Sequence, residues 1–329
     1  MPDLRRLILS TLAAVVLPAA LFSPVRAEPA QAYPSRAIKI VVPFPPGGAA
    51  DTYARLIGQK LSDALAQPVV VENKPGAGGQ VATQAVARAP ADGYTLMVVT
   101  VGHAVNPSLY ASLPYDTEKD LTPVAGLATV PSVLVVNPTV PANNLKELLA
   151  LARAQPGQLG YASSGNASTS HVAAAMLADL AAVQMLHVPY RGSAPAITDL
   201  ISGQVQLMID PWVSSAQHVK SGRLRALAIT SPKRSALAPE LPTLAESGLP
   251  GYEFTAWFML LAPGATPPAI VAKLNEQVAR ALAQADLREK YQSQGAEPGQ
   301  GSPAELQAFL RAEIRRYAKL VKDTGMKAE

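Results

Sequence analysis

The sequence predicts an α/β fold built from two successive units. Short apolar runs alternate with helical patterns twice along the chain, and this alternation is typical of parallel sheets with helices on their faces. The 329 residues are 49% hydrophobic and 16% charged, a globular composition with enough length for two cores. Two sequential domains are the plain interpretation. The absence of a flexible linker favours two lobes joined by crossing strands, with the C-terminal helices returning to the first lobe.

The first unit reads as strand–helix–strand–helix–strand. Apolar side chains recur at helical spacing after the first apolar run, which indicates an amphipathic helix. We expect strands at 38–44, 68–73 and 95–100, and helices at 52–65 and 80–89. The pattern then breaks, because 106–121 is rich in turn residues and 122–138 holds two strand-like runs separated by Pro131.

The second unit repeats the alternation. We expect helices at 145–154, 170–181 and 195–202, and strands at 160–163, 185–190, 205–210 and 224–230. A proline-rich loop at 232–252 leads to a further strand at 254–263, and helices at 269–285 and 303–323 close the chain. Ser302, Pro303 and Glu305 form the start signature of the last helix, a capping box with proline at the first helical position.

The N-terminus has the pattern of a secretory signal peptide. Arg5 and Arg6 precede an apolar stretch at 7–22, and small residues follow, so we expect cleavage after Ala27 or as late as Ala32. The apolar stretch is too short and interrupted to suit a membrane anchor. Because the chain has no cysteine, it cannot be a lipoprotein, and we expect the mature protein free in the periplasm. Sec and twin-arginine export both stay open.

Two glycine loops follow the first two predicted strands. PFPPGGAAD (43–51) and NKPGAGG (73–79) each lie between a strand and a helix, where glycine lets the backbone approach a ligand and free helix N–H groups attract anions. Asp51 suits the helix N-cap. An ordinary strand–helix turn is the alternative. Neither loop is a dinucleotide fingerprint or a P-loop, and since parallel strands end at one edge, both should face the same site.

The second unit offers a facing set of polar residues. YASSGNASTSH (161–171) concentrates hydroxyls before a predicted helix, and HVPYRG (187–192) brings Tyr190 and Arg191 to a strand end. A capping loop and a solvated arginine are the alternatives. Asp210 ends another strand, where it either meets a ligand donor or caps a turn.

Other chemistries find little support. The sequence has no G-x-S-x-G motif around Ser163 or Ser164, and its four histidines lack metal-site spacing. No basic run suggests nucleic acid. We therefore predict no catalytic residue, no metal, no cofactor and no nucleic-acid partner.

Together these motifs resemble the Bug-type solute receptors of tripartite tricarboxylate transporters. The resemblance covers nearly the whole mature chain in order. Its segments are YPSRAIKIVVPFPPGGAADTYAR, VVVENKPGAGG, ADGYTLMVV, NPSLY, LTPVAGLATVPSVLVVNP, YASSGNASTSH, HVPYRGSAPAITDLISGQVQLMID, LRALAIT, LPTLAESGLPGYE and LLAPGATPP.

The resemblance implies a type II periplasmic binding protein with crossing strands as hinge, one lobe at 33–130 plus 255–329 and the other at 131–254. It implies a monomeric receptor that closes on a small organic carboxylate and delivers it to membrane transporter subunits, without catalysis. By position it implies a site made of Phe44, Gly47, Gly48, Ala49, Asp51, Gly78, Gly79, Thr100, Asn106, Ser163, Ser164, Gly165, Tyr190, Arg191 and Asp210.

Two departures from the family pattern fall near this site. Arg191 stands where many relatives have lysine, and Thr-Ser-His at 169–171 stands where many have a glycine before the histidine. They leave the identity of the acid open. A sensor that presents its closed form to a signalling protein and a serine hydrolase using Ser163 or Ser164 are the rival functions.

Overall fold

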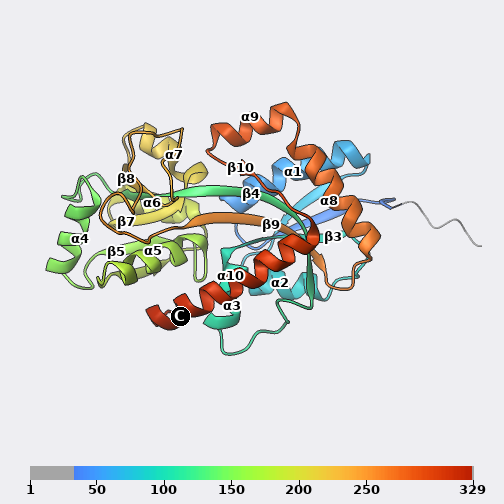
Figure 1. The fold of residues 1–329 in the computed structure, drawn as a ribbon, viewed down its shortest axis with the longest axis horizontal. Coiled ribbons are helices and arrows are strands. Elements are labelled where there is room, and N and C mark those ends of the chain that lie inside the picture. Colours follow the sequence, from blue (N-terminus) through green and yellow to red (C-terminus); the bar gives the residue numbers. More distant parts are fainter. Residues whose placement is uncertain (1–32, 328–329) are drawn as a thin grey trace, which may run out of the picture. The chain divides into compact units, whose positions relative to one another are not determined.

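One ten-stranded mixed sheet organises residues 33–327, which are the residues that the computed structural model describes. The main strand order is β2-β1-β3-β9-β4-β7-β5-β6, with β8 and β10 also paired to β4 (Figure 1). The signal peptide expected at 1–27 lies outside the described residues.

The first three strands confirm the predicted strand–helix series. β1 (Ile38–Val42) pairs in parallel with β2 (Val69–Asn73) and with β3 (Thr95–Thr100). The helices between them are α1 (Ala49–Leu65), a single 3₁₀ turn (Ala77–Gly79) and α2 (Gln80–Ala87). Because these strands are parallel, the loops that follow them leave one edge of the sheet.

The prediction of a turn-rich segment from residue 106 was wrong at its start. Helix α3 (Val101–Leu109) begins directly after β3 and contains Pro107. Val101, Ala104 and Val105 are buried on it, and this apolar stripe outweighs the missing N–H of the proline, which falls two residues before the helix ends.

The two strand-like runs around Pro131 form one strand, β4 (Leu121–Val136), and not two. Residues 121–131 pair with β9 (Thr255–Pro263), whereas 132–136 pair with β7 (Leu207–Pro211) and β8 (Arg225–Ile229). Pro131 lies where the ladder changes partners, so its missing N–H removes no central bond. β4 and β9 run side by side through the middle of the fold (Figure 1).

Residues 132–254 hold the second group of elements. They comprise α4 (Leu145–Ala154), β5 (Gly160–Ser163), α5 (Thr169–Leu180), β6 (Leu186–Pro189), α6 (Ser193–Ser202) and α7 (Trp212–Lys220). β5 pairs in parallel with β6 and β7. Helix α7 was not predicted, because its Trp-Val-Ser-Ser start has no clear apolar stripe.

The C-terminal segment packs back onto the first elements. α8 (Pro268–Leu282) shares a hydrophobic core with α1, and α10 (Pro303–Thr324) packs against α3 and α5. The short α9 (Ala285–Ser293) and β10 (Glu297–Pro298) lie between them and were not predicted. The capping box is confirmed, since Ser302 and Glu305 exchange side-chain and backbone hydrogen bonds.

We call the elements around β1–β3 the first half and those of residues 132–254 the second half. Residues 33–327 cluster as one unit, so the lobe boundaries at 131 and 254 stay a prediction.

A buried hydrogen bond joins β9 to α10 and gives a test of this packing. The Trp257 indole Nε1 donates to Glu313 Oε2 at 2.8 Å, and both side chains are buried. We predict that Glu313→Leu lowers the free energy of unfolding by about 1–3 kcal/mol, because the indole N–H loses its acceptor. Urea unfolding measures this, and Glu313→Gln, which keeps an acceptor, should lose less. Equal losses in both variants would show that the hydrogen bond is unimportant.

Candidate functional site

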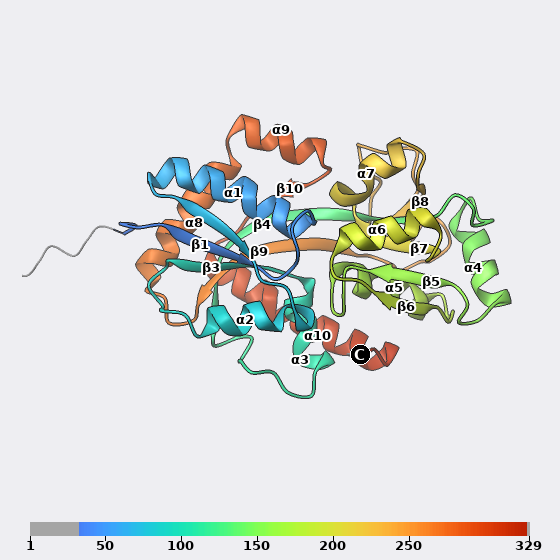
Figure 2. The same cartoon turned by 180° about the vertical axis from the view of Figure 1, so that it is seen from behind.

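The loops that leave the first half and those that leave the second half meet over one cavity. In Figure 2 the loop after β1 lies beside the start of α6. A Cβ placed on Gly192 would lie 3.2 Å from the Pro45 ring, so the two loops are in close contact. Gly192 has φ +106°, a backbone region that glycine adopts readily and other residues rarely do.

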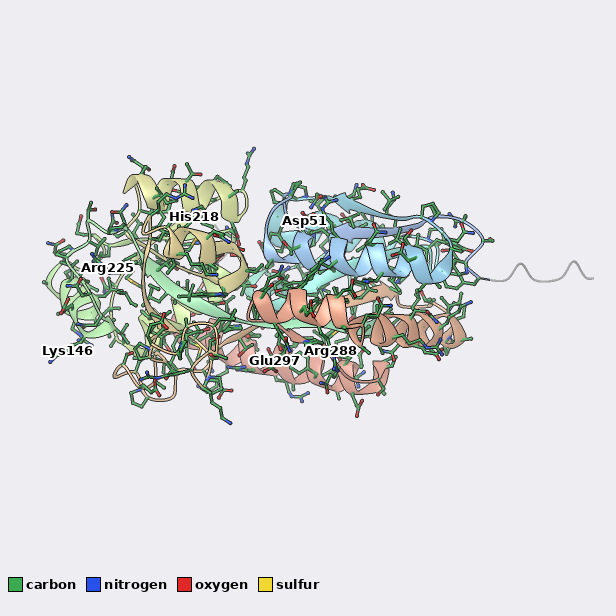
Figure 3. The ribbon with its side chains drawn as sticks, turned by 90° about the horizontal axis from the view of Figure 1, so that it is seen from above. Asp51, Lys146, His218, Arg225, Arg288 and Glu297 are labelled. Carbon is green, nitrogen blue, oxygen red and sulfur yellow. The ribbon has the colours of Figure 1, made fainter. Side chains whose placement is uncertain are left out.

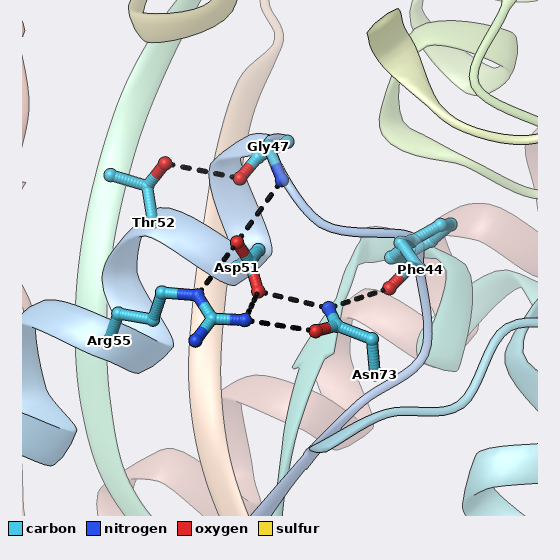
Figure 4. Close-up of polar contacts among 7 residues, drawn as sticks. Phe44, Gly47, Asp51, Thr52, Arg55 and Asn73 are labelled. Carbon is cyan, nitrogen blue, oxygen red and sulfur yellow. Dashed lines mark hydrogen bonds and ion pairs between the residues drawn. The ribbon is translucent and has the colours of Figure 1, made fainter. Parts of the chain in front are cut away.

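Asp51 stabilises the first glycine loop from within. Its carboxylate accepts hydrogen bonds from Gly47 N (3.1 Å), Arg55 Nε (3.0 Å) and Asn73 Nδ2 (2.9 Å). Asn73 also donates to Phe44 O (Figure 4). Burial opposes ionisation, but the hydrogen bonds from Arg55, Asn73 and Gly47 outweigh it and lower the pKa of Asp51.

The prediction that Asp51 is the N-cap of α1 was wrong. Gly48 is the N-cap residue and has no side chain, and Asp51 is the third helical residue, whose carboxylate turns back to the loop. Figure 3 shows Asp51 at the N-terminal end of α1, whereas Lys146 and Arg225 lie at the far end of the second half. The Asp51 carboxylate is engaged by its own neighbours, and its role is to shape the loop.

The central cavity encloses about 400 Å³ of empty space, part of it open to solvent. Both halves contribute to its wall, and none of its lining residues carries a charge. They are Phe44, Pro45, Gly48, Ala49, Ala50, Thr100, Ser164, Thr169, Gly192, Ser193, Pro211 and Phe258.

Five helices begin at this cavity. Gly48, Thr100, Gly192 and Pro211 are the N-cap residues of α1, α3, α6 and α7, and Thr169 is the first residue of α5. The first N–H groups of a helix have no acceptor within the helix, and the helix dipole makes that end positive. The cavity therefore has the character of an anion site built without a cationic side chain.

A larger side cleft adjoins the central cavity and shares Phe44, Pro45, Ser164 and Gly192 with it. Its empty space, which again includes some open solvent, is about 1,280 Å³. Its other lining residues are Pro43, Pro75, Gly76, Ala77, Gly78, Gly79, Tyr110, Gly165, Asn166, Pro189, Tyr190 and Arg191. A ligand that fills the central cavity can extend into this cleft, where Arg191 provides a positive charge.

Most of the predicted site residues come together here. The central cavity is lined by Phe44, Gly48, Ala49, Thr100 and Ser164, and the side cleft by Gly78, Gly79, Gly165, Tyr190 and Arg191. Gly47 lines a third hollow, beside α6 and α7.

The remaining four predicted residues line none of these cavities and lie behind the wall. They are Asp51, Asn106, Ser163 and Asp210. Each is buried and hydrogen-bonded to a residue of a cavity wall: Asp51 to Gly47, Asn106 to Gly78, Ser163 to Gly165 and Asp210 to Ser193.

Asp210 stands out among them because its carboxyl has no exposed surface and no cationic partner among the ion pairs of the described residues. Ser193 Oγ donates to Oδ1 and Ser215 Oγ donates to Oδ2, both at 3.2 Å. Burial raises the pKa of Asp210 to about 7, against the hydrogen bonds from these serines.

Ser163 has a histidine partner but no access to either cavity. Its Oγ lies 2.6 Å from His187 Nε2 and is completely buried. His187 stacks on His171 at 3.9 Å, and burial lowers the pKa of His187 to about 4. This pair braces the loop at 163–165, because Ser163 Oγ also accepts from Gly165 N.

Sequence reasoning missed the wall residues Ser193 and Pro211, and it named Thr169 only as part of the hydroxyl-rich segment near the site. For Ser193 a signal was present, since Gly192-Ser193 directly precedes an amphipathic helix. For Pro211 there was none, because α7 itself was not recognised. Among residues 33–327 no group of three histidine or acidic side chains could hold a metal ion. In the same range no helix has the length and apolarity that crossing a membrane requires.

Comparison with known proteins identifies one family. Residues 53–326 match the model of the tripartite tricarboxylate transporter family receptor. Protein BugT of Bordetella pertussis is 40% identical over 324 residues, covering 97% of this chain and 98% of BugT.

Two solved structures from Rhodopseudomonas palustris share the fold. Rpa4515 with adipate is 41% identical with a TM-score of 0.86, covering 89% of this chain and 98% of Rpa4515. MatC with bound malate is 37% identical with a TM-score of 0.84, covering 88% of this chain and all of MatC.

The raised pKa of Asp210 predicts a pH-dependent stability. In the unfolded chain an aspartate titrates near 4, so the stabilising contribution of protonated Asp210 is fully present below pH 4 and is lost as the pH rises through 7. Relative to Asp210→Asn, the wild type should lose roughly 4 kcal/mol of unfolding free energy between pH 4 and 8. Denaturant unfolding of both proteins across this range measures the difference, and parallel pH profiles would contradict the shift.

Proposed function

We propose that this chain, which belongs to the tripartite tricarboxylate transporter family of receptors, binds a small organic carboxylate in its central cavity. As a member of this family it is a solute receptor. The observation that carries the ligand class is the convergence of five helix N-termini on one uncharged cavity. An anion gains hydrogen bonds and a favourable dipole field there, without the desolvation of a buried cation.

The energetics suit reversible capture. A hydrogen bond to a charged acceptor contributes roughly 1.5–3 kcal/mol. Several such bonds, after the cost of association, support a micromolar complex at about −8 kcal/mol. The adipate and malate bound by the two similar proteins are both small dicarboxylates. We infer that one carboxylate occupies the central cavity and that the rest of the ligand extends towards the side cleft and Arg191.

We infer that the two halves close over the ligand by bending at β4 and β9, the two long strands that connect them. Two close approaches between the backbones of the two halves support this inference. A Cβ on Gly102 of α3 would lie 2.6 Å from Ala167 O in the loop before α5, and one on Gly78 would lie 3.2 Å from Asn166 O. Glycine at these positions lets opposing backbones touch.

The mature receptor works, in this proposal, as a periplasmic monomer that delivers its ligand to membrane transporter subunits. The signal-peptide pattern at residues 1–27 and the family support export. A role as a ligand sensor would use the same binding site. Pull-down of signalling and transporter proteins with and without ligand separates the two roles.

We further propose that the site performs no catalysis. Ser163 is the hydroxyl with a histidine partner, but it is buried and lines neither the central cavity nor the side cleft. Loss of the added acid in a mass-spectrometric time course would overturn this proposal.

Thermal unfolding with a panel of organic acids tests the ligand class. We predict that the mature protein gains thermal stability with at least one di-, tri- or aromatic carboxylate, with adipate and malate in the panel, because ligand binds only the folded state. Gly48→Trp should abolish the shift by filling the cavity. Gly48→Ala is the matched control, since its Cβ would make only an ordinary 3.9 Å contact with Ser193 Oγ. No shift with any acid would refute the ligand class.

Gly102→Ala tests closure away from the cavity wall. We predict that the variant binds the acid at least tenfold more weakly, because its Cβ would collide with Ala167 O on closing. Unliganded protein should unfold at the wild-type temperature or above it, since alanine suits a helix better than glycine. Calorimetry and thermal unfolding provide the two readouts. Destabilisation of the unliganded variant would instead indicate that the contact is present in both states.

A further inference from the structure

We propose that carboxylate binding in the central cavity is coupled to protonation of Asp210, which acts as a positioning residue through the hydroxyl of Ser193. The inference rests on the proposed function and adds a regulation of the same site. It starts from an unusual juxtaposition: a buried carboxyl lies one side chain behind the wall of a cavity suited to carboxylates.

Ser193 links Asp210 directly to the central cavity. Ser193 lines the central cavity and donates to Asp210 Oδ1, whereas Ser215, which donates to Oδ2, is completely buried. Ser193 is also the first residue of α6, so its hydroxyl lies at one of the five helix N-termini that line the cavity.

Among residues 33–327, no charged side chain offsets the charge of Asp210. The titratable side chains on the elements around it are Tyr161 of β5, His171 and Asp179 of α5, His187 of β6, Tyr190 and Arg191 before α6, Asp199 of α6, His218 and Lys220 of α7, and Arg225 of β8. Residues 132–136 of β4 contribute none. Asp199 accepts from Tyr190, and Arg225 donates to backbone carbonyls. Only burial and serine hydroxyls act on the pKa of Asp210, which they place at about 7.

The protonation state of Asp210 decides what Ser193 offers to a ligand. An ionised carboxylate is only an acceptor, so the single O–H of Ser193 must point to it. The lone pairs of the serine oxygen then face the cavity, and they repel a ligand carboxylate. A protonated Asp210 can itself donate to Ser193 Oγ, which frees the serine O–H to donate to the ligand.

The same argument follows from charge alone. A ligand carboxylate and an ionised Asp210 on either side of one serine would be two like charges in a poorly solvated site, which raises the pKa of one of them. Binding should therefore take up a proton wherever Asp210 is ionised in the free protein. Affinity should be highest at about pH 6, where the ligand carboxylate is still ionised, and fall as the pH rises above 7.

Isothermal titration calorimetry of the wild type tests the coupling without any variant. Adipate and malate are the probes, titrated at pH 7.5 in buffers of different ionisation enthalpy. We expect an uptake of roughly 0.5–1 proton per ligand bound, and an approximately tenfold loss of affinity between pH 7 and 8.5. Binding without proton uptake, or with a flat affinity over this range, overturns the inference while leaving the proposed function intact.

Three variants show which residues carry the pH dependence of binding. Asp210→Asn keeps a donor and an acceptor for Ser193, so it should bind at pH 8.5 at least as tightly as the wild type, with no proton uptake. Ser193→Ala should bind more weakly at low pH and lose most of the pH dependence. Ser215→Ala is the matched control: it removes a hydrogen bond to the same carboxyl, so coupling should persist with its midpoint moved to higher pH.

The outcomes separate the two proposals. If none of the organic acids binds, the proposed function fails and the coupling fails with it. If an acid binds with proton uptake that survives in Asp210→Asn, another group carries the proton and the role of Asp210 is overturned. Should Asp210→Asn fold poorly, the wild-type and Ser215→Ala measurements decide the question.

Discussion

Five helix N-termini converge on the central cavity, and their amide groups supply its positive potential without a charged side chain. This convergence depends on strand direction. β1 and β3 in the first half, and β5, β6 and β7 in the second, are each followed directly by one of these helices. Because these strands are parallel to one another within each half, their helices start at one edge. The loops between these strands and helices then need only to be short and to let the two halves approach each other closely.

The glycine and proline residues of these loops serve that approach. Pro45 packs against Gly192, and Gly102 lies against the backbone of Ala167. Side chains at the glycine positions would hold the halves apart and widen the cavity. The buried carboxylate of Asp51 has a related role, since it fixes the amide of Gly47 and, through Asn73, the carbonyl of Phe44. Charge in this protein therefore organises the loops, whereas neutral groups line the central cavity.

Sequence reasoning predicted the elements that have strong periodicity. The β-branched run at Ile38–Val42 and the apolar stripe of α1 left little choice of structure. Helix α7 was missed because it follows Pro211 and has no clear apolar stripe, and β4 was divided at Pro131 because a proline usually ends a strand. That proline lies where β4 exchanges β9 for β7 and β8, a long-range fact that no local pattern contains.

The site shows a similar division between what is local and what is not. The glycine loops and Ser164 could be predicted, since each follows a recognisable strand. Whether a polar residue faces the cavity or supports the wall from behind depends on tertiary packing, and the sequence treated both groups alike. Asp51, Asn106, Ser163 and Asp210 are all buried supports. Only the N-cap assignment of Asp51 was wrong, and the reason is local: its position suits a cap while its carboxylate turns back to Gly47.

An anion site made of amides and hydroxyls behaves differently from one made of arginine or lysine. A cationic side chain attracts a carboxylate at every pH below its own high pKa, and its charge is not changed by a neighbour's proton. An amide can only donate, so the helix N-termini provide a constant attraction. A hydroxyl donates or accepts according to its partner. Ser193 is such a group, placed between the cavity and the buried carboxyl of Asp210. A single proton behind the wall is therefore sufficient to change the polarity of the wall itself, with no movement of the backbone.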